Sequence, residues 1–125
     1  MIVNLLRLTL RDDITDDERA EVLEALRRTA SLESVSFSTV GEVFGDPTGR
    51  VIGYVVGIAD IEALQRYMHD PVHLAGDDII LPRVSHGSAV RFASEPVGDQ
   101  VYAIAAAKAA KYPEWGRRVA EIFGE

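Results

Sequence analysis

Residues 60–74 have the sequence DIEALQRYMHDPVHL, which predicts a helix that is interrupted by a proline. Asp60 is a residue type that caps helix N-termini, and the apolar side chains after it recur at helical spacing: Ile61, Leu64, Tyr67 and Met68. Pro71 has no amide hydrogen and pushes Asp70 out of helical geometry, so it ends this helix. Asp70 and Pro71 also suit the start of a second helix, with Asp70 as its N-cap and Pro71 as its first residue. We expect the second helical piece to run to about residue 80.

The segments on either side of this break give an alternating order of strands and helices. Residues 2–11 alternate with period two and predict a strand, and residues 34–44 and 50–59 predict a hairpin around turn residues 45–49. Thr15 to Glu18 form a capping box that predicts a helix over residues 16–30, and residues 85–94 predict the last strand. The order β-α-β-β-α-β is an α+β, ferredoxin-like plan. Helices on one sheet face leave the other face bare, so we expect a partner or ligand there.

Residues 97–125 differ in composition from the rest of the chain. Residues 1–96 carry 9 Lys and Arg against 16 Asp and Glu, whereas residues 97–125 carry 4 of each. We therefore divide the chain into a domain of residues 1–96 and a C-terminal helical extension of residues 97–125. Asp99 is a candidate cap, Pro113 predicts a break, and an apolar stripe follows it: Trp115, Val119, Ile122 and Phe123. We expect the extension to be ordered and to bury Trp115 against the domain or a partner subunit.

The composition excludes several classes of protein. The chain has 125 residues, a formal net charge of −7 and no cysteine. It has no basic stripe that would bind nucleic acid, and no apolar run approaches the ~20 residues that span a membrane. The lack of cysteine removes disulfides, Fe–S clusters and cysteine nucleophiles. The N-terminal residues have no signal-peptide pattern, so we expect a cytoplasmic protein with no nucleic-acid or membrane partner.

The most specific motif of the chain runs from Asp60 to His73 and is followed by Leu81-Pro82. With this motif and the β-α-β-β-α-β order, the chain resembles the stress-responsive dimeric α/β-barrel family, often called Dabb. The resemblance covers about residues 1–95. It implies an obligate homodimer in which two four-stranded sheets pack face to face as a barrel, with the helices outside. It also implies a pocket between each sheet and its helices.

The resemblance also implies candidate catalytic residues. Some members of the family are polyketide cyclases that close a ring by intramolecular aldol condensation, and in these a tyrosine and a histidine six residues later do the acid/base work. Those two map onto Tyr67 and His73. Where related proteins carry further histidines, this chain has Asn4 and Gly53. We take Asn4 as the candidate ligand-binding residue on the first strand.

Each candidate residue also has a structural interpretation. His73 would fix the proline junction, and Tyr67 would be a core aromatic. His69 and His73 have the four-residue spacing of metal ligands, but Pro71 lies between them, so we predict no metal site. Haem chemistry, known in related barrels, pairs a histidine with a tryptophan, and the only tryptophan of this chain lies in the extension. The charged pair Asp77-Asp78 is interpreted as a solvated face.

Two functions follow from the sequence. The first is a small-molecule enzyme, a cofactor-independent acid/base cyclase or lyase of the polyketide-cyclase type, which acts on a small apolar or polyketide-like molecule through Tyr67, His73 and Asn4. The second is a non-catalytic, stress-responsive or apolar-ligand-binding dimeric barrel. Convergence of the three side chains around a cavity would favour the first function, and a filled pocket would favour the second.

Overall fold

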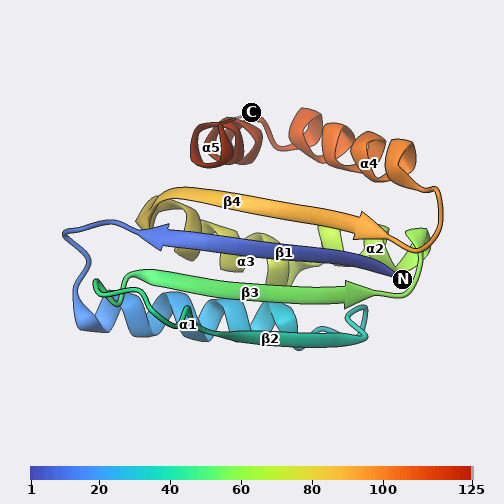
Figure 1. Cartoon of the computed structure of the whole chain (residues 1–125). Helices are drawn as coiled ribbons and strands as arrows, with labels where there is room; N and C mark the ends of the chain where they lie inside the picture. Colours follow the sequence, from blue (N-terminus) through green and yellow to red (C-terminus); the bar gives the residue numbers. More distant parts are fainter. Residues whose placement is uncertain (125) are drawn as a thin grey trace.

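A four-stranded antiparallel sheet forms the centre of the structure, a computed structural model that describes residues 1–124. The strands are β1 (Ile2–Leu10), β2 (Phe37–Glu42), β3 (Val51–Ile58) and β4 (Val84–Ala93), in the spatial order β2-β3-β1-β4. The helices of the domain are α1 (Asp16–Ala30), α2 (Ile61–His69) and α3 (Pro71–Ile80), and a short 3₁₀ turn, η1 (Leu81–Arg83), precedes β4. Figure 1 shows these helices behind the sheet. The predicted α+β, ferredoxin-like fold is therefore confirmed.

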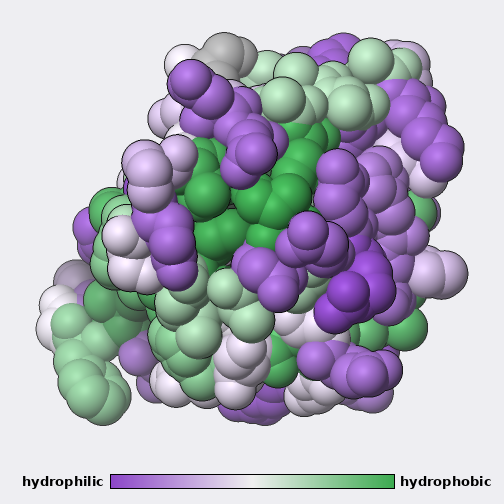
Figure 2. All heavy atoms as spheres, turned by 90° about the vertical axis from the view of Figure 1, so that its right-hand side faces the viewer, coloured by the Kyte–Doolittle hydropathy of each residue, from purple (hydrophilic) through white to green (hydrophobic). Residues whose placement is uncertain are grey.

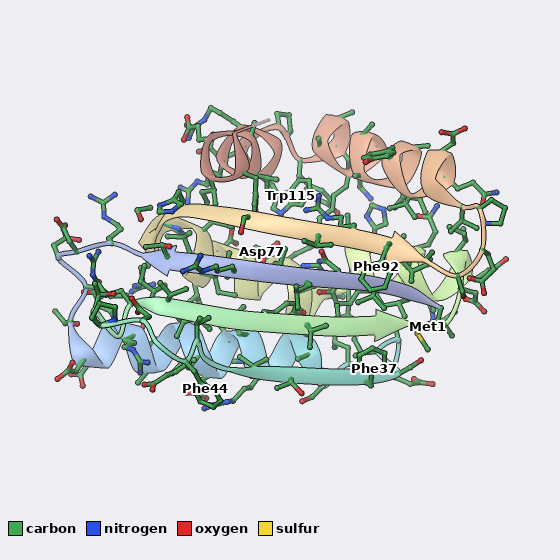
Figure 3. The ribbon with its side chains drawn as sticks, in the orientation of Figure 1. Met1, Phe37, Phe44, Asp77, Phe92 and Trp115 are labelled. Atoms are coloured by element: carbon green, nitrogen blue, oxygen red, sulfur yellow. The ribbon has the colours of Figure 1, made fainter. Side chains whose placement is uncertain are left out.

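The two faces of the sheet differ because side chains alternate along each strand. Even-numbered residues of β1 and β3 face the helices and form the core, as the fully buried Ile52 and Val56 do. On the opposite face, one row of paired residues runs across the four strands. Its members, in order from β2 to β4, are Phe37, Gly57, Val3 and Phe92. Figure 3 shows Phe37 and Phe92 on the two outer strands. An apolar row with an exposed aromatic ring at each end thus crosses the whole sheet, and we call this surface the open face.

Gly57 is the position at which this face needs a glycine. A Cβ atom added at Gly57 would lie 1.9 Å from the ring of Phe37, whereas one added at Gly53 would make only an ordinary 3.6 Å contact with Val43. A close approach therefore occurs at Gly57, where the missing side chain lets an aromatic ring lie across the neighbouring strand.

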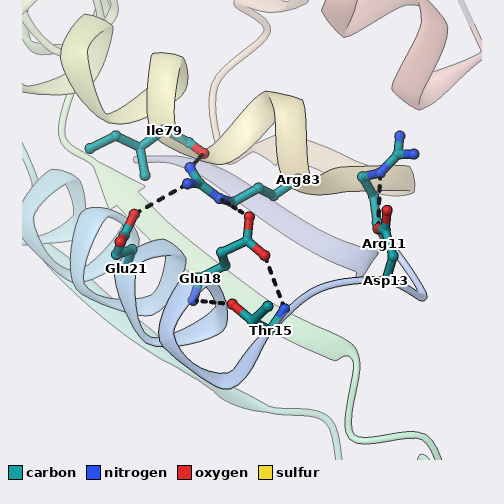
Figure 4. Close-up of polar contacts among 7 residues, drawn as sticks. All are labelled: Arg11, Asp13, Thr15, Glu18, Glu21, Ile79 and Arg83. Atoms are coloured by element: carbon teal, nitrogen blue, oxygen red, sulfur yellow. Dashed lines mark hydrogen bonds and ion pairs between the residues drawn. The ribbon is translucent and has the colours of Figure 1, made fainter.

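The helix ends follow the capping chemistry of the sequence. The Thr15 hydroxyl accepts from the amide of Glu18, and the Glu18 carboxylate accepts from the amide of Thr15, which confirms the capping box. Glu18 also meets Arg83 of η1 (Nε–Oε2 3.4 Å), so the start of α1 is tied to the turn before β4 (Figure 4). Asp60 accepts from the amide of Ala63, and the helix restarts at the proline as predicted.

The extension forms α4 (Gly98–Lys111) and α5 (Pro113–Phe123), and both helices pack on the domain of the same chain. They lie along the β4 edge (Figure 1), where α5 contacts β4 and α4 contacts α2. The ring of Phe123 covers Gly87, where an added Cβ would lie 2.7 Å from it. The prediction for Asp99 was wrong: α4 begins at Gly98 with Val97 at the cap position and no side-chain capping bond, so Asp99 lies inside the first turn.

The surface has one further apolar area at the end where β1 begins. Figure 2 views the molecule from this end and shows apolar atoms gathered near the centre, within a frame of hydrophilic side chains. Among residues 1–124, no helix combines the length and apolar character that crossing a membrane requires.

Candidate functional site

Tyr67 and His73, the two predicted catalytic residues, lie side by side. Tyr67 is on the last turn of α2 and His73 is on the first turn of α3, so the break at Asp70 separates them. Their ring centroids are 4.3 Å apart. On an unbroken helix, six residues would turn the two side chains about 120° apart. The break brings them together, because Asp70 accepts from the amide of Val72 and restarts the helix in a new direction.

Tyr67 is the middle member of a buried chain of polar groups. Its hydroxyl lies 2.5 Å from the hydroxyl of Tyr54, which reaches it from the helix-facing side of β3. Burial raises the pKa of Tyr67 well above the ordinary value for a phenol, and the neighbouring Tyr54 raises it further. Burial also raises the pKa of Tyr54. Both phenols therefore keep their protons at neutral pH, and one hydroxyl donates the bond that the other accepts.

His73 is held in one tautomer by its surroundings. Its Nδ1 lies 2.7 Å from the backbone oxygen of Tyr67, and because a carbonyl oxygen only accepts, Nδ1 must carry the proton. Burial lowers the pKa of His73, and Lys108 lowers it further, although Asp77 opposes both. At neutral pH the imidazole is therefore neutral, with a free electron pair on Nε2. Nε2 lies 3.4 Å from Oδ2 of Asp77, so a proton that arrived there would meet a carboxylate.

Asp77 is a central member of this cluster, and its interpretation as part of a solvated face was wrong. Its side chain is only 16% exposed. Its Oδ2 accepts a 2.8 Å hydrogen bond from the indole of Trp115, which comes from α5 (Figure 3). Asp77 is turned inward because it lies one helical turn after His73, on the same face of α3. The adjacent Asp78 is exposed, as predicted.

The extension also contributes a buried lysine. Lys108 of α4 is 0% exposed, and its Nζ lies 4.3 Å from the centre of the Trp115 ring. Burial lowers the pKa of Lys108 to about 8, although the Asp77 carboxylate opposes this. Five side chains thus follow one another from the sheet to the extension, and we call them the polar cluster: Tyr54, Tyr67, His73, Asp77 and Lys108.

Asn4, the predicted ligand-binding residue, lies on the same sheet face as Tyr54. It pairs with Val56 of β3, two residues along that strand from Tyr54. Its Oδ1 is buried and has no hydrogen-bond partner among the described residues. The structure therefore places Asn4 on the sheet floor beside the cluster, and no contact joins it to Tyr67 or His73.

Four members of the polar cluster are buried: Tyr54, Tyr67, His73 and Lys108. A groove of about 740 Å³ lies along α1, and a cavity of about 300 Å³ lies beside Arg83 (Figure 4), and neither is lined by a member of the cluster. His69 does not join His73, since its ring faces Tyr112 at 6.3 Å. Within residues 1–124, no three His, Cys, Asp or Glu side chains come together as a group that would hold a metal ion.

Sequence reasoning missed three members of this arrangement. The signal for Asp77 was its four-residue spacing from His73, which places both on one helix face. The signal for Tyr54 was its position on the apolar side of a strand, where a buried hydroxyl needs a partner. Lys108 had no comparable signal, because nothing in an alanine-rich helix shows which lysine faces inward.

The comparisons with known proteins agree with this fold. Residues 2–95 match the stress responsive A/B barrel domain, Dabb. No curated protein matches the chain. A dimeric ferredoxin-like protein of unknown function from Thermobifida fusca is 24% identical, with a TM-score of 0.63, over 74% of this chain and 91% of that one.

Two further solved structures share the fold at lower identity. A Dabb family protein from Mesorhizobium loti is 14% identical, with a TM-score of 0.58, over 75% of this chain and 97% of that one. A variant of SnoaB, a cofactor-independent oxygenase from Streptomyces nogalater, is 11% identical, with a TM-score of 0.58, over 75% and 92%. The domain match spans most of the sequence and leaves only the extension outside, so this chain belongs to the stress responsive A/B barrel domain family.

Proposed function

We propose that this chain is a small-molecule enzyme of the dimeric barrel class, a cofactor-independent acid/base cyclase or lyase of the polyketide-cyclase type. The observation that carries the proposal is the tautomer of His73. Its Nδ1–H donates a hydrogen bond to the backbone oxygen of Tyr67, so Nε2 carries no proton, and the Asp77 carboxylate lies 3.4 Å from it. Nε2 is therefore the nitrogen that would accept a proton, and a carboxylate lies near enough to stabilise the imidazolium that would result.

His73 would take the proton in the first step. Nε2 would remove a proton from a carbon next to a ketone, and the resulting enolate carbon would attack a second carbonyl of the same molecule. The Asp77 carboxylate would stabilise the imidazolium formed in this step, since it lies 3.4 Å from Nε2. His73 would then return the proton to the new alkoxide, so that the reaction needs no cofactor or oxidant.

Tyr67 would stabilise the negative charge that develops on oxygen. Its phenol stays protonated because burial raises its pKa, and the hydroxyl of Tyr54 lies 2.5 Å away and supports it. A buried donor in a fixed position stabilises a developing oxyanion more than water does. Asn4, with an unpartnered Oδ1 on the sheet floor, would orient the ligand.

Access to the cluster would require the extension to move. Tyr67 and His73 are both buried, and α4 and α5 bring Lys108 and Trp115 against the same cluster. The proposal therefore includes an opening of the extension that admits a small apolar or polyketide-like molecule. Motions of this kind gate many enzymes on the microsecond to millisecond timescale.

We propose that the active form is a homodimer that pairs two open faces, in the cytoplasm. The open face carries four half-exposed apolar side chains in neighbouring rows: Leu5, Phe37, Val90 and Phe92. A monomer that left this row in water would be prone to associate. Two of the solved structures with this fold are described as dimeric proteins.

A non-catalytic barrel is the second candidate, and the burial of the cluster favours it. Neither of the two surface cavities described above reaches Tyr67 or His73. In this case the cluster is a buried hydrogen-bonded core that fixes the helix break and the extension, and any bound molecule would be an apolar ligand that is not converted.

Turnover of a poly-β-keto substrate by the purified protein separates the two candidates. The enzyme proposal expects ring closure above the spontaneous rate, and His73→Ala should reduce it by ~10²–10⁴. Tyr67→Phe should cost less, because it keeps the ring and removes only the hydroxyl. Asp78→Ala, which alters an exposed residue on the same helix as His73, is the matched control and should leave the rate unchanged. Turnover that survives in His73→Ala, or that never exceeds the spontaneous rate, would favour the non-catalytic barrel.

A further inference from the structure

Lys108 is a buried cation whose hydrogen bonds are not made. Its side chain is 0% exposed, and its Nζ has no hydrogen-bond partner among the described residues. The contacts of the ammonium are the face of Trp115, at 4.3 Å, and the electrostatic attraction of Asp77. An ammonium group has three donors and no acceptor, so this position offers three hydrogen bonds to an incoming oxygen.

The burial of this group is expensive unless an acceptor meets it. A cation–π contact replaces part of the lost hydration, and a carboxylate in the neighbourhood replaces another part. Neither one accepts a hydrogen bond from Nζ in this structure. The nearest carboxylate, Asp77, already receives the indole N–H of Trp115 on Oδ2. Trp115 and Asp77 therefore offset the cost of burying the charge only in part, and the direct acceptor position at Nζ is free among the described residues.

The position of Lys108 links it to the proposed reaction site. Its charge acts on His73, since it lowers the pKa of that imidazole, and both groups face Asp77. Further unpartnered buried atoms occur on the elements beneath the extension: Nδ1 of His69 on α2, which packs against α4, and Oδ1 of Asn4 on β1. Polar groups that could meet a ligand thus occur on both the domain and the extension.

We infer that Lys108 binds an anionic oxygen of the ligand, and that the ligand is a 3-keto acid whose carboxylate lies on the Lys108 ammonium. The inference rests on the proposed site and names its substrate class. With the carboxylate at Lys108, the ketone oxygen would face Tyr67. The acidic carbon between the carboxylate and the ketone would face His73. The extension then has a defined role, because it supplies the cationic member of the polar cluster, Lys108.

The choice of a carboxylate follows from charge. A charged hydrogen bond is roughly twice as strong as a neutral one, so an ammonium in a buried site selects an anion over a neutral ketone or ester. The phenols of Tyr54 and Tyr67 are neutral donors and suit an uncharged ketone oxygen, whereas Asp77 repels a second anion from its side of the cluster. One anionic group, at the Lys108 end, therefore fits the arrangement.

Calorimetric titration with two probes of equal chain length tests this inference. The probes are 3-oxooctanoate and its methyl ester, which differ only in the charge of the carboxyl end. The protein should bind the acid more tightly than the ester by on the order of tenfold to a hundredfold, the effect of a hydrogen bond to a charged group. Lys108→Met should remove this preference and leave the affinity for the ester unchanged.

Lys111→Met is the matched control, because it removes an exposed lysine from the same helix. This variant should keep the preference for the acid. Equal binding of acid and ester by the unaltered protein would overturn the inference, as would a full preference in Lys108→Met or no binding of either probe at millimolar concentration. The comparison of acid with ester in the unaltered protein does not depend on the folding of any variant.

The two proposals fail separately. A clear preference for the acid that depends on Lys108, without turnover of the poly-β-keto substrate, would keep the binding site and remove the cyclase. Turnover that depends on His73, with equal binding of acid and ester, would keep the enzyme and remove the role of Lys108.

Discussion

The indole nitrogen of Trp115 donates a 2.8 Å hydrogen bond to Oδ2 of Asp77, and this bond joins α5 to α3 across 38 positions of the sequence. The same carboxylate lies 3.4 Å from Nε2 of His73. One side chain of the domain thus holds the extension and also faces the candidate base. Any change at this bond is therefore expected to act on the docking of the extension and on the site together.

Replacement of Trp115 by Phe should weaken the fold by about 1–3 kcal/mol, because the Asp77 oxygen loses its donor while the ring that covers Lys108 remains. Urea unfolding followed by circular dichroism measures the change in unfolding free energy. Tyr102→Phe, at a 72% exposed position of α4, is the control and should change it by less than about 0.5 kcal/mol. Equal stabilities for the two variants would show that the bond to Asp77 does not hold the extension.

The buried ammonium of Lys108 should make the protein more stable as the pH rises from 8 to 9.5. Burial lowers the pKa of Lys108 to about 8 from an ordinary value of 10.5. Between these values the unfolded chain binds more protons than the folded one, so the unfolding free energy rises with pH, by about 1.5 kcal/mol over this interval. The groups that face Lys108 are Asp77 and His73 of α3 and Trp115 of α5, and none of them is altered in the comparison.

The measurement is urea unfolding at pH 8 and at pH 9.5 for the unaltered protein and for Lys108→Met. The phenols of Tyr54 and Tyr67 are present in both proteins, so their contribution cancels in the difference. The rise in unfolding free energy between pH 8 and pH 9.5 should be absent from Lys108→Met and present in Lys111→Met. Parallel profiles for all three proteins would mean that Lys108 is hydrated in solution.

The fold could be predicted because its signals are local. Alternating residues, the capping box at Thr15 and the restart at Asp70 each depend on side chains a few positions apart, and each is present in the structure. The predicted pair Tyr67 and His73 also depends on a local feature, the proline break. The element ends differ most at β2, where the expected strand of residues 34–44 shortens to Phe37–Glu42, the stretch in continuous register with β3.

The remainder of the site could not be predicted because it depends on tertiary packing. The spacing from His73 places Asp77 on the inner face of its helix, but its partner Trp115 comes from a segment 38 positions away, which no local pattern indicates. Lys108 resembles Lys111, and only the packing of α4 against α2 decides which one is buried. Contacts between segments far apart in the sequence leave no periodic signal, so a charged residue that becomes buried there reads as a surface residue.

The homodimer proposed for the open face should dissociate when a charge is placed in its centre. Leu5→Asp puts a carboxylate on β1 between Val55 and Val90, in a pairing expected to bury ~2,000 Å² or more. Light scattering should give twice the chain mass of 13.7 kDa for the unaltered protein and the single mass for the variant. Tyr102→Asp, on the exposed side of α4, should remain dimeric. A single-chain mass for the unaltered protein at micromolar concentration would contradict the pairing.

The central claim is that His73 is a neutral base with its proton on Nδ1, and nitrogen NMR of the imidazole tests it directly. At pH 7 the spectrum should show a protonated Nδ1 and an unprotonated Nε2, with a pKa below the ordinary value of 6.5 because the ring is buried. Asp77→Asn should lower the pKa further, and Lys108→Met should raise it, since these two charges act on the ring in opposite directions. A proton on Nε2, or a fully charged imidazolium at pH 7, would contradict the account, because Nε2 would then have no free electron pair to accept a proton.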